Sequence, residues 1–98
     1  MLTHIVLFNF SGKSENKNQI IKTLKDKLDN LKNKIPQLKK LETGINISHR
    51  SNAYDLALIA EFESSEDLEF YRNHPDHQAV ITYIREIAID TVVVDFLK

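Results

Sequence analysis

The strands that this sequence predicts are apolar on both faces, and this feature restricts the fold more than any other. The segment LTHIVLFNF alternates in the manner of a strand, with Val6 and Phe8 on one face and Ile5 and Leu7 on the other. The segments YDLALIAEF and TVVVDFL are also apolar on both sides. Helices packed against a single sheet can cover only one of its faces.

The uncovered face would expose on the order of several hundred Å² of contiguous apolar surface, which is more than soluble monomers usually tolerate. We therefore expect a homodimer in which a second copy packs sheet against sheet, with a cavity between or beneath the sheets. The alternative is that loops partly cover the second face.

The segments between these strands give the order of the elements. An amphipathic helix is predicted from Glu15 to Ile35, where Pro36 disfavours further helical geometry. Its apolar residues recur at steps of three and four: Ile20, Ile21, Leu24, Leu28, Leu31 and Ile35. The SGKS segment before it, residues 11–14, is a predicted turn.

After this helix, LETGINIS predicts a half-buried strand over residues 41–48, and HRSNA predicts a short hairpin loop before the strand at 54–62. Ser64 and Asp67 have capping-box spacing at the start of a helix that ends near Asn73. Pro75 is a favourable first-turn residue for a second helix, which runs to about Ile87. The last predicted strand covers residues 91–97.

The resulting order, β-α-β-β-α-α-β, is a split βαβ pattern. It predicts an α+β, ferredoxin-like fold with an antiparallel four-stranded sheet and helices on one face. All 98 residues fit one domain, because a chain of this length is long enough for one core and too short for two.

The composition excludes several classes of function. The chain has no cysteine, so it has no disulfide, thiolate zinc site or cysteine nucleophile. The start of the sequence shows no basic leader, and its apolar run is too short to cross a bilayer, so we expect a soluble, cytoplasmic protein without a membrane partner. Residues 1–40 carry nine lysines and three acidic residues, but no arginine and no aromatic residue among the lysines. A solvated helix surface therefore explains these lysines better than a nucleic-acid site.

Four segments together resemble a known family. They are HIVLFNF, IPQLKKLETGIN, AYDLALIAEFESSEDLEFYRNHPDHQAV and the closing VVVDF. They are similar to the stress-responsive dimeric α/β-barrel (Dabb) family, over nearly the whole chain. The resemblance implies a ferredoxin-like protomer and a homodimeric α/β barrel, which agrees with the two-faced strands. It implies the fold more strongly than any function.

One plant branch of this family includes a polyketide cyclase whose catalytic tyrosine and histidine lie in a motif that resembles YRNHPDH. Carried over to this chain, that pair implies Tyr71 and His77 as catalytic residues. The resemblance also implies pocket roles for His4 and Asp95. A further pocket histidine of the cyclase corresponds to Leu56 here, which is a departure that argues against the cyclase's own substrate.

The chemistry of these residue types fits such a role. The imidazole of His77 suits a general base near neutral pH, and the Tyr71 hydroxyl suits a donor to a carbonyl oxygen. Alternatively, Tyr71 packs on the sheet and His77 is a first-turn helix residue. His74, before Pro75, is a helix-junction residue and a candidate ligand-binding residue with His4 and Asp95. No metal site is predicted, since two neighbouring histidines are too few ligands for zinc.

Three functions remain open from the sequence. The first is a barrel protein that binds a small apolar or carbonyl-bearing ligand. The second is a cofactor-independent, acid–base enzyme of the cyclase or lyase type that uses Tyr71 and His77. The third is a structural dimerisation module. An open pocket onto which Tyr71 and His77 both converge favours the enzyme, and a filled interior favours the structural module.

Overall fold

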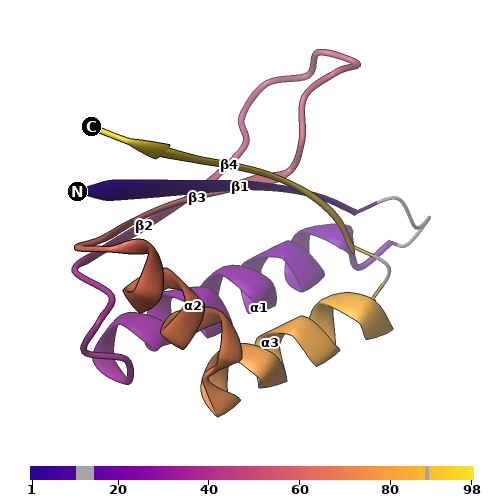
Figure 1. Cartoon of the computed structure of the whole chain (residues 1–98). Helices are drawn as coiled ribbons and strands as arrows, with labels where there is room; N and C mark the ends of the chain where they lie inside the picture. The colour runs from indigo at the N-terminus through magenta and orange to yellow at the C-terminus, as the bar shows by residue number, and fades with distance from the viewer. Residues whose placement is uncertain (11–14, 88) are drawn as a thin grey trace.

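The computed structural model describes residues 1–10, 15–87 and 89–98, and within them it has one four-stranded sheet with three α-helices on one side (Figure 1). The strands lie in the order β2-β3-β1-β4, and every neighbouring pair is antiparallel. The elements are β1 Leu2–Phe10, α1 Lys17–Asp29, a 3₁₀ helix Asn30–Asn33, β2 Lys40–Ile45, β3 Leu56–Phe62, α2 Ser65–Asn73, α3 Pro75–Glu86 and β4 Ile89–Leu97. This confirms the predicted ferredoxin-like fold.

The seam between α2 and α3 follows from its sequence. His74 has an extended backbone, with φ −65° and ψ 137°, so it ends α2 and begins α3. Its side chain accepts a hydrogen bond from the backbone N–H of Asp76 at 3.1 Å, and Pro75 occupies the first turn of α3. At the other end of α2, the Ser64 hydroxyl accepts from the Asp67 N–H at 3.2 Å, as the capping spacing predicts.

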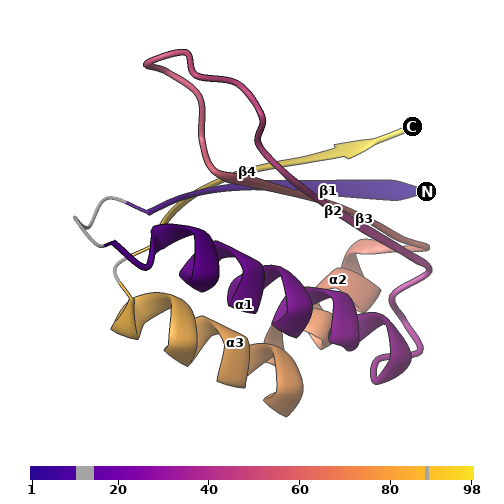
Figure 2. The ribbon, with the colours of Figure 1, turned by 180° about the vertical axis from the view of Figure 1, so that it is seen from behind.

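Two predicted boundaries are wrong in the same region of the chain. The second strand ends at Ile45 instead of Ser48, because the Asn46 side chain makes hydrogen bonds of 2.8 and 2.9 Å to the backbone of Ser48 and turns the chain there. The third strand begins at Leu56, after Asp55. The connecting loop therefore spans residues 46–55, and it rises above the side of the sheet opposite the helices (Figure 2).

Smaller differences occur elsewhere. The α-helical part of the first helix starts at Lys17 and ends at Asp29, and the last turn before Pro36 is 3₁₀. The final strand begins two residues earlier than predicted, at Ile89. The predicted turn at residues 11–14 lies outside the described residues.

The inner face of the sheet, against the helices, forms the core. It consists of alternate residues of β1 and β3, and Leu24, Ile35 and Tyr71 pack against it with 0–1% of their surface exposed. The strand residues of this core are Leu2, Val6, Phe8, Phe10, Leu56, Leu58, Ala60 and Phe62, with Ile89 at the start of β4. These are the faces that the alternation in the sequence predicts.

The opposite side of the sheet carries no helix, as both ribbon views show (Figures 1 and 2). Five of its large apolar side chains are between 36% and 60% exposed. We call this surface the outer sheet face: Leu7, Ile59, Val92, Val94 and Phe96. The expectation that helices cover only one of two apolar faces is therefore confirmed.

Candidate functional site

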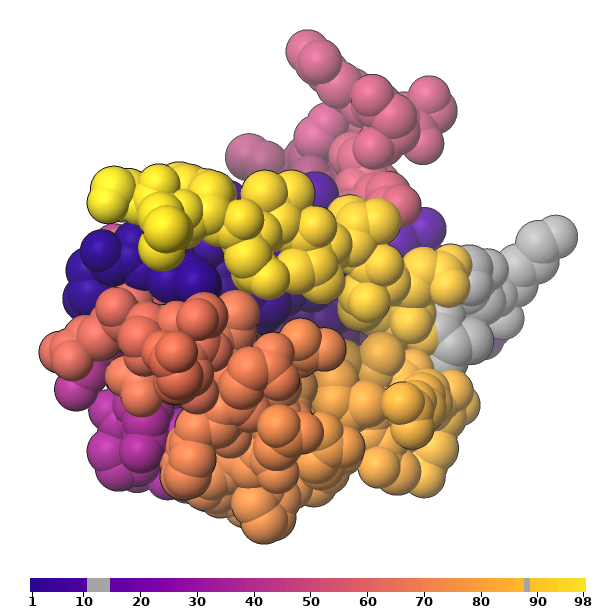
Figure 3. Space-filling view, in the orientation of Figure 1, coloured from indigo at the N-terminus to yellow at the C-terminus, as the bar shows by residue number. Residues whose placement is uncertain are grey.

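A cavity of about 280 Å³ lies between the inner face of the sheet and the helices. In the space-filling view, atoms of β1 are visible between β4 on one side and the helices α2 and α3 on the other (Figure 3). Residues from these same elements, together with one residue each of α1 and β3, line the cavity, so β4 forms one side of its opening. The lining residues are His4, Val6, Phe8, Leu28, Leu58, Tyr71, Arg72, His77, Val80, Ile81, Ile84, Thr91, Val93 and Asp95.

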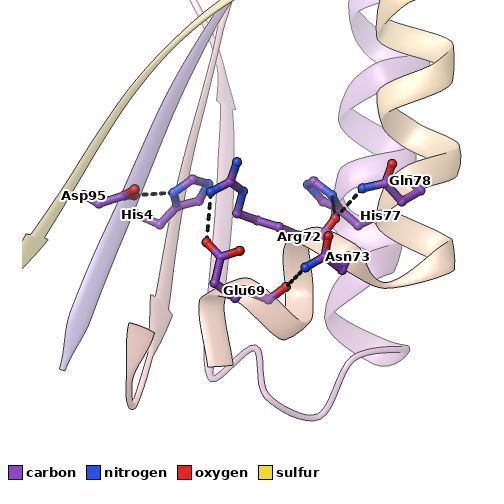
Figure 4. Close-up of polar contacts among 7 residues, drawn as sticks. All are labelled: His4, Glu69, Arg72, Asn73, His77, Gln78 and Asp95. Carbon is purple, nitrogen blue, oxygen red and sulfur yellow. Dashed lines mark hydrogen bonds and ion pairs between the residues drawn. The ribbon is translucent and has the colours of Figure 1, made fainter. Parts of the chain in front are cut away.

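His4 and Asp95 form a pair on adjacent strands. They are direct partners in the register of β1 and β4, so both side chains lie on the inner face. The Nδ1 atom of His4 lies 2.5 Å from Oδ1 of Asp95 (Figure 4). A carboxylate beside Nδ1 accepts its proton and leaves Nε2 as the second functional nitrogen of the ring. Asp95 thus holds the ring of His4 in place.

His77 is oriented by the backbone at the helix seam. Its Nδ1 atom lies 3.1 Å from the carbonyl oxygen of Arg72, and the Gln78 amide donates to the same oxygen at 2.6 Å (Figure 4). Since a carbonyl oxygen only accepts, Nδ1 of neutral His77 carries the proton and Nε2 is unprotonated. The imidazole is thus held in the tautomer that a general base requires.

The surroundings of His77 favour its neutral form. Burial lowers the pKa of His77 below its usual value, because the charged ring loses solvation. The hydrogen bond to the Arg72 carbonyl opposes this effect. The positive charges of His4, Arg72 and His74 lower the pKa further. His77 is therefore neutral at pH 7.

Tyr71 lies between the two histidines. Its ring centroid is 4.4 Å from that of His77 and 6.3 Å from that of His4, and it packs on Phe62 at 5.1 Å. Burial raises the pKa of the Tyr71 hydroxyl well above its usual value, so the group stays protonated. Among the described residues its hydroxyl makes no hydrogen bond. The O–H group is thus a free donor in a mostly apolar cavity.

The structure brings together four of the five residues named from the sequence, and His74 is the exception. His74 lines a separate surface depression with Phe70 and Pro75, and its ring lies 6.0 Å from that of Phe70. Its Nδ1 atom is occupied as the cap of α3, so His74 acts on the cavity only through its charge. Sequence reasoning missed Arg72, which follows Tyr71 and lines the cavity.

The described part of the chain supports neither a metal site of clustered side chains nor a membrane-spanning helix. No group of three or more histidine and acidic side chains within it is placed to hold a metal ion. None of the helices in the described ranges is both long and apolar enough to cross a membrane.

The family model of the stress responsive A/B barrel domain, Dabb, matches residues 2–97 of this chain. The chain belongs to this family. A curated relative of this Dabb domain is an uncharacterised protein of Streptomyces coelicolor, 32% identical over 89 residues, which are 90% of this chain and 91% of the relative.

Solved structures agree with this assignment. A dimeric protein of Bacteroides fragilis with a ferredoxin-like fold has a TM-score of 0.87 to the Dabb domain, at 29% identity, over 99% of this chain and 95% of that one. A hydroxynitrile lyase of Passiflora edulis has a TM-score of 0.80 at 20% identity, over 99% and 92% of the two chains. At that identity the likeness shows the fold alone.

Proposed function

We propose that this Dabb domain binds a small, largely apolar molecule with a carbonyl group in the cavity beneath its sheet. The observation that carries the proposal is the Tyr71 hydroxyl, which is held protonated and has no hydrogen-bond partner among the described residues. A donor of this kind matches a carbonyl oxygen. The apolar remainder of the lining matches a hydrocarbon body, and the volume suits a small molecule, since pockets for drug-sized ligands usually measure about 300–1,000 Å³.

Binding of 4-phenylbutan-2-one and of the matched hydrocarbon butylbenzene tests this proposal by ligand-observed NMR. We expect the ketone to bind more tightly than the hydrocarbon, and Tyr71→Phe to remove that preference, which is worth about 1 kcal/mol for one hydrogen bond. Tyr83→Phe is the matched control, because Tyr83 packs outside the cavity lining. A ketone preference that persists in Tyr71→Phe contradicts the proposal.

The second candidate function is acid–base catalysis at the same carbonyl group. The observation that favours it is the contact between a neutral imidazole and a protonated phenol, His77 and Tyr71, in one cavity. The Nε2 atom of His77 takes a proton from the carbon beside the carbonyl. The electron pair of that C–H bond becomes the C=C bond of an enolate, and its oxygen is stabilised by the Tyr71 O–H. Return of the proton from His77 completes the cycle without a cofactor.

Exchange of the α-protons of the bound ketone in D₂O measures this step directly. We expect protein-dependent exchange that falls by about 10²-fold or more in His77→Gln, which removes the base. His49→Gln is the matched control, since His49 is exposed in the loop of residues 46–55 and does not line the cavity. If the ketone binds but its α-protons do not exchange faster in the presence of the protein, the catalytic function is refuted and the binding function stands.

We also propose that two copies pair through the outer sheet face. The exposed apolar side chains of that face support this, as does the dimeric state of the similar Bacteroides fragilis protein. Sedimentation is expected to show twice the chain mass of 11.4 kDa, and Val94→Glu is expected to shift it to one chain mass. Phe70→Glu, on α2, changes an apolar residue of similar exposure elsewhere on the surface and serves as the control. A single-chain mass for the unaltered protein refutes the pairing.

A further inference from the structure

The ionisable groups that line the cavity are unequal in sign. Apart from the neutral Tyr71 hydroxyl, three of them are basic, His4, Arg72 and His77, and one is acidic, Asp95. The Asp95 carboxylate is already engaged by His4. Arg72 is the lining residue with a permanent positive charge, because a guanidinium does not lose its proton in proteins. Within the lining, this cation has no acidic partner of its own.

The one ion pair of Arg72 within the described residues is weak, and its partner, Glu69, does not line the cavity. Its Nη1 atom is 3.0 Å from Oε1 of Glu69, and the two side chains are 58% and 59% exposed. Such solvent-exposed pairs contribute about 0–1 kcal/mol. A guanidinium has five N–H donors, and this ion pair uses one nitrogen of the fork. The rest of the fork remains available to a ligand.

The position of Arg72 relates this charge to the carbonyl site. Arg72 directly follows Tyr71 in α2, and its side chain extends from the helix toward the sheet, on the side of His4 (Figure 4). A ligand in a cavity of about 280 Å³ that accepts from Tyr71 therefore has Arg72 beside it. Only a few atoms can separate the two recognised groups in so small a space.

We propose that the cavity selects oxo acids, small molecules that carry a carboxylate as well as a carbonyl group, and that Arg72 binds the carboxylate. This inference rests on the proposed function, since it names the kind of carbonyl compound that enters. A planar carboxylate matches the guanidinium fork. A monoanion also suits one permanent cation in an otherwise largely apolar lining better than a doubly charged phosphate ester does.

The test compares acids with their neutral analogues of nearly equal size. The probes are 2-oxohexanoate, 4-oxohexanoate and 5-oxohexanoate, each with its methyl ester, and their affinities are measured by titration with NMR detection. We expect at least one acid to bind about ten-fold more tightly than its ester, the value of one charge-assisted hydrogen bond. Arg72→Gln is expected to bring that ratio to about one by weakening the acid alone.

Glu69→Gln is the matched control for a structural role of the ion pair. It breaks the same pair but leaves the cation free, so acid affinity is expected to stay equal or to increase. If Glu69→Gln and Arg72→Gln weaken the acid alike, the specificity role is refuted. Thermal unfolding checks that Arg72→Gln folds, which its exposure favours.

The two proposals fail in different ways. If the esters bind and the acids bind no better, the selection of oxo acids is refuted and the carbonyl pocket stands. If 4-phenylbutan-2-one binds but neither the acids nor the esters do, the selection of oxo acids alone is refuted, and if none of these compounds binds to the unaltered protein, both proposals are refuted. An acid preference that Arg72→Gln does not reduce assigns the preference to another group and overturns the role of Arg72.

Discussion

Replacement of Tyr71 by phenylalanine separates a structural from a functional role for this residue. Tyr71 is 1% exposed, and its ring packs on Phe62 and His77. The ring accounts for its packing, and Phe preserves the ring. A hydroxyl that made a hydrogen bond within the protein would cost about 0.5–1.5 kcal/mol on removal.

The Tyr71 hydroxyl makes no such bond among the described residues. We therefore expect Tyr71→Phe to leave the free energy of unfolding unchanged, or to raise it by up to about 1 kcal/mol because an unpaired polar group is removed. Tyr71→Ala, in contrast, removes the ring and is expected to cost about 3–5 kcal/mol. The function of the hydroxyl then appears only in ketone affinity and in α-proton exchange.

Urea unfolding followed by circular dichroism measures these differences, at one fixed protein concentration because pairing of chains would shift the midpoint. Tyr83→Phe is again the control, and neither its stability nor its ketone affinity is expected to change. A loss of more than about 1 kcal/mol in Tyr71→Phe, with unchanged ketone affinity, would refute the reasoning. The hydroxyl would then be a structural group.

Two further predictions concern pH and the end of β1. Because the pKa of His77 is lower in the folded than in the unfolded chain, the unfolded chain binds more protons below the usual histidine pKa of about 6.5, and stability is lost as pH falls through that range. Urea midpoints at several pH values from 7.5 to 5 are expected to show a smaller loss in His77→Gln, and an identical loss in both proteins would contradict the assignment. Asp55 accepts from the Phe10 N–H at 2.7 Å and pairs with Lys17 at 3.1 Å, so Asp55→Ala is expected to cost about 1–3 kcal/mol and Lys17→Ala less than about 1 kcal/mol. Equal losses for these two variants, measured by urea unfolding, would show that the hydrogen bond to Phe10 contributes little.

The fold was predictable because its determinants are periodic and local. The alternation around Val6 and Phe8 sets the two faces of β1, and Pro75 marks the seam between the helices. The end of β2 was not predictable from alternation. Asn46 and Ile47 continue the strand pattern, while the Asn46 side chain binds the backbone and ends the strand.

The site was predictable in its residue types and less so in its geometry. The pairing of His4 with Asp95 depends on the register between the first and last strands, which are 91 residues apart at these positions. No local pattern contains that register. Arg72 was missed because a charged residue on an amphipathic helix normally faces solvent, and more than half of its side chain does so. Its sequence position directly after Tyr71 was the available signal.

The alternation along β4 makes two surfaces share one strand. Val92, Val94 and Phe96 belong to the outer sheet face, and Asp95 and Val93 line the cavity between them. Because each side chain of β4 reaches only one of these surfaces, substitutions on the outer sheet face can occur without changing the cavity, and substitutions in the cavity can occur without changing the outer sheet face. Insertion or deletion of a single codon within this strand exchanges the two sets. It would turn a carboxylate to the apolar face and valines toward His4, so this strand is expected to vary in composition but not in length.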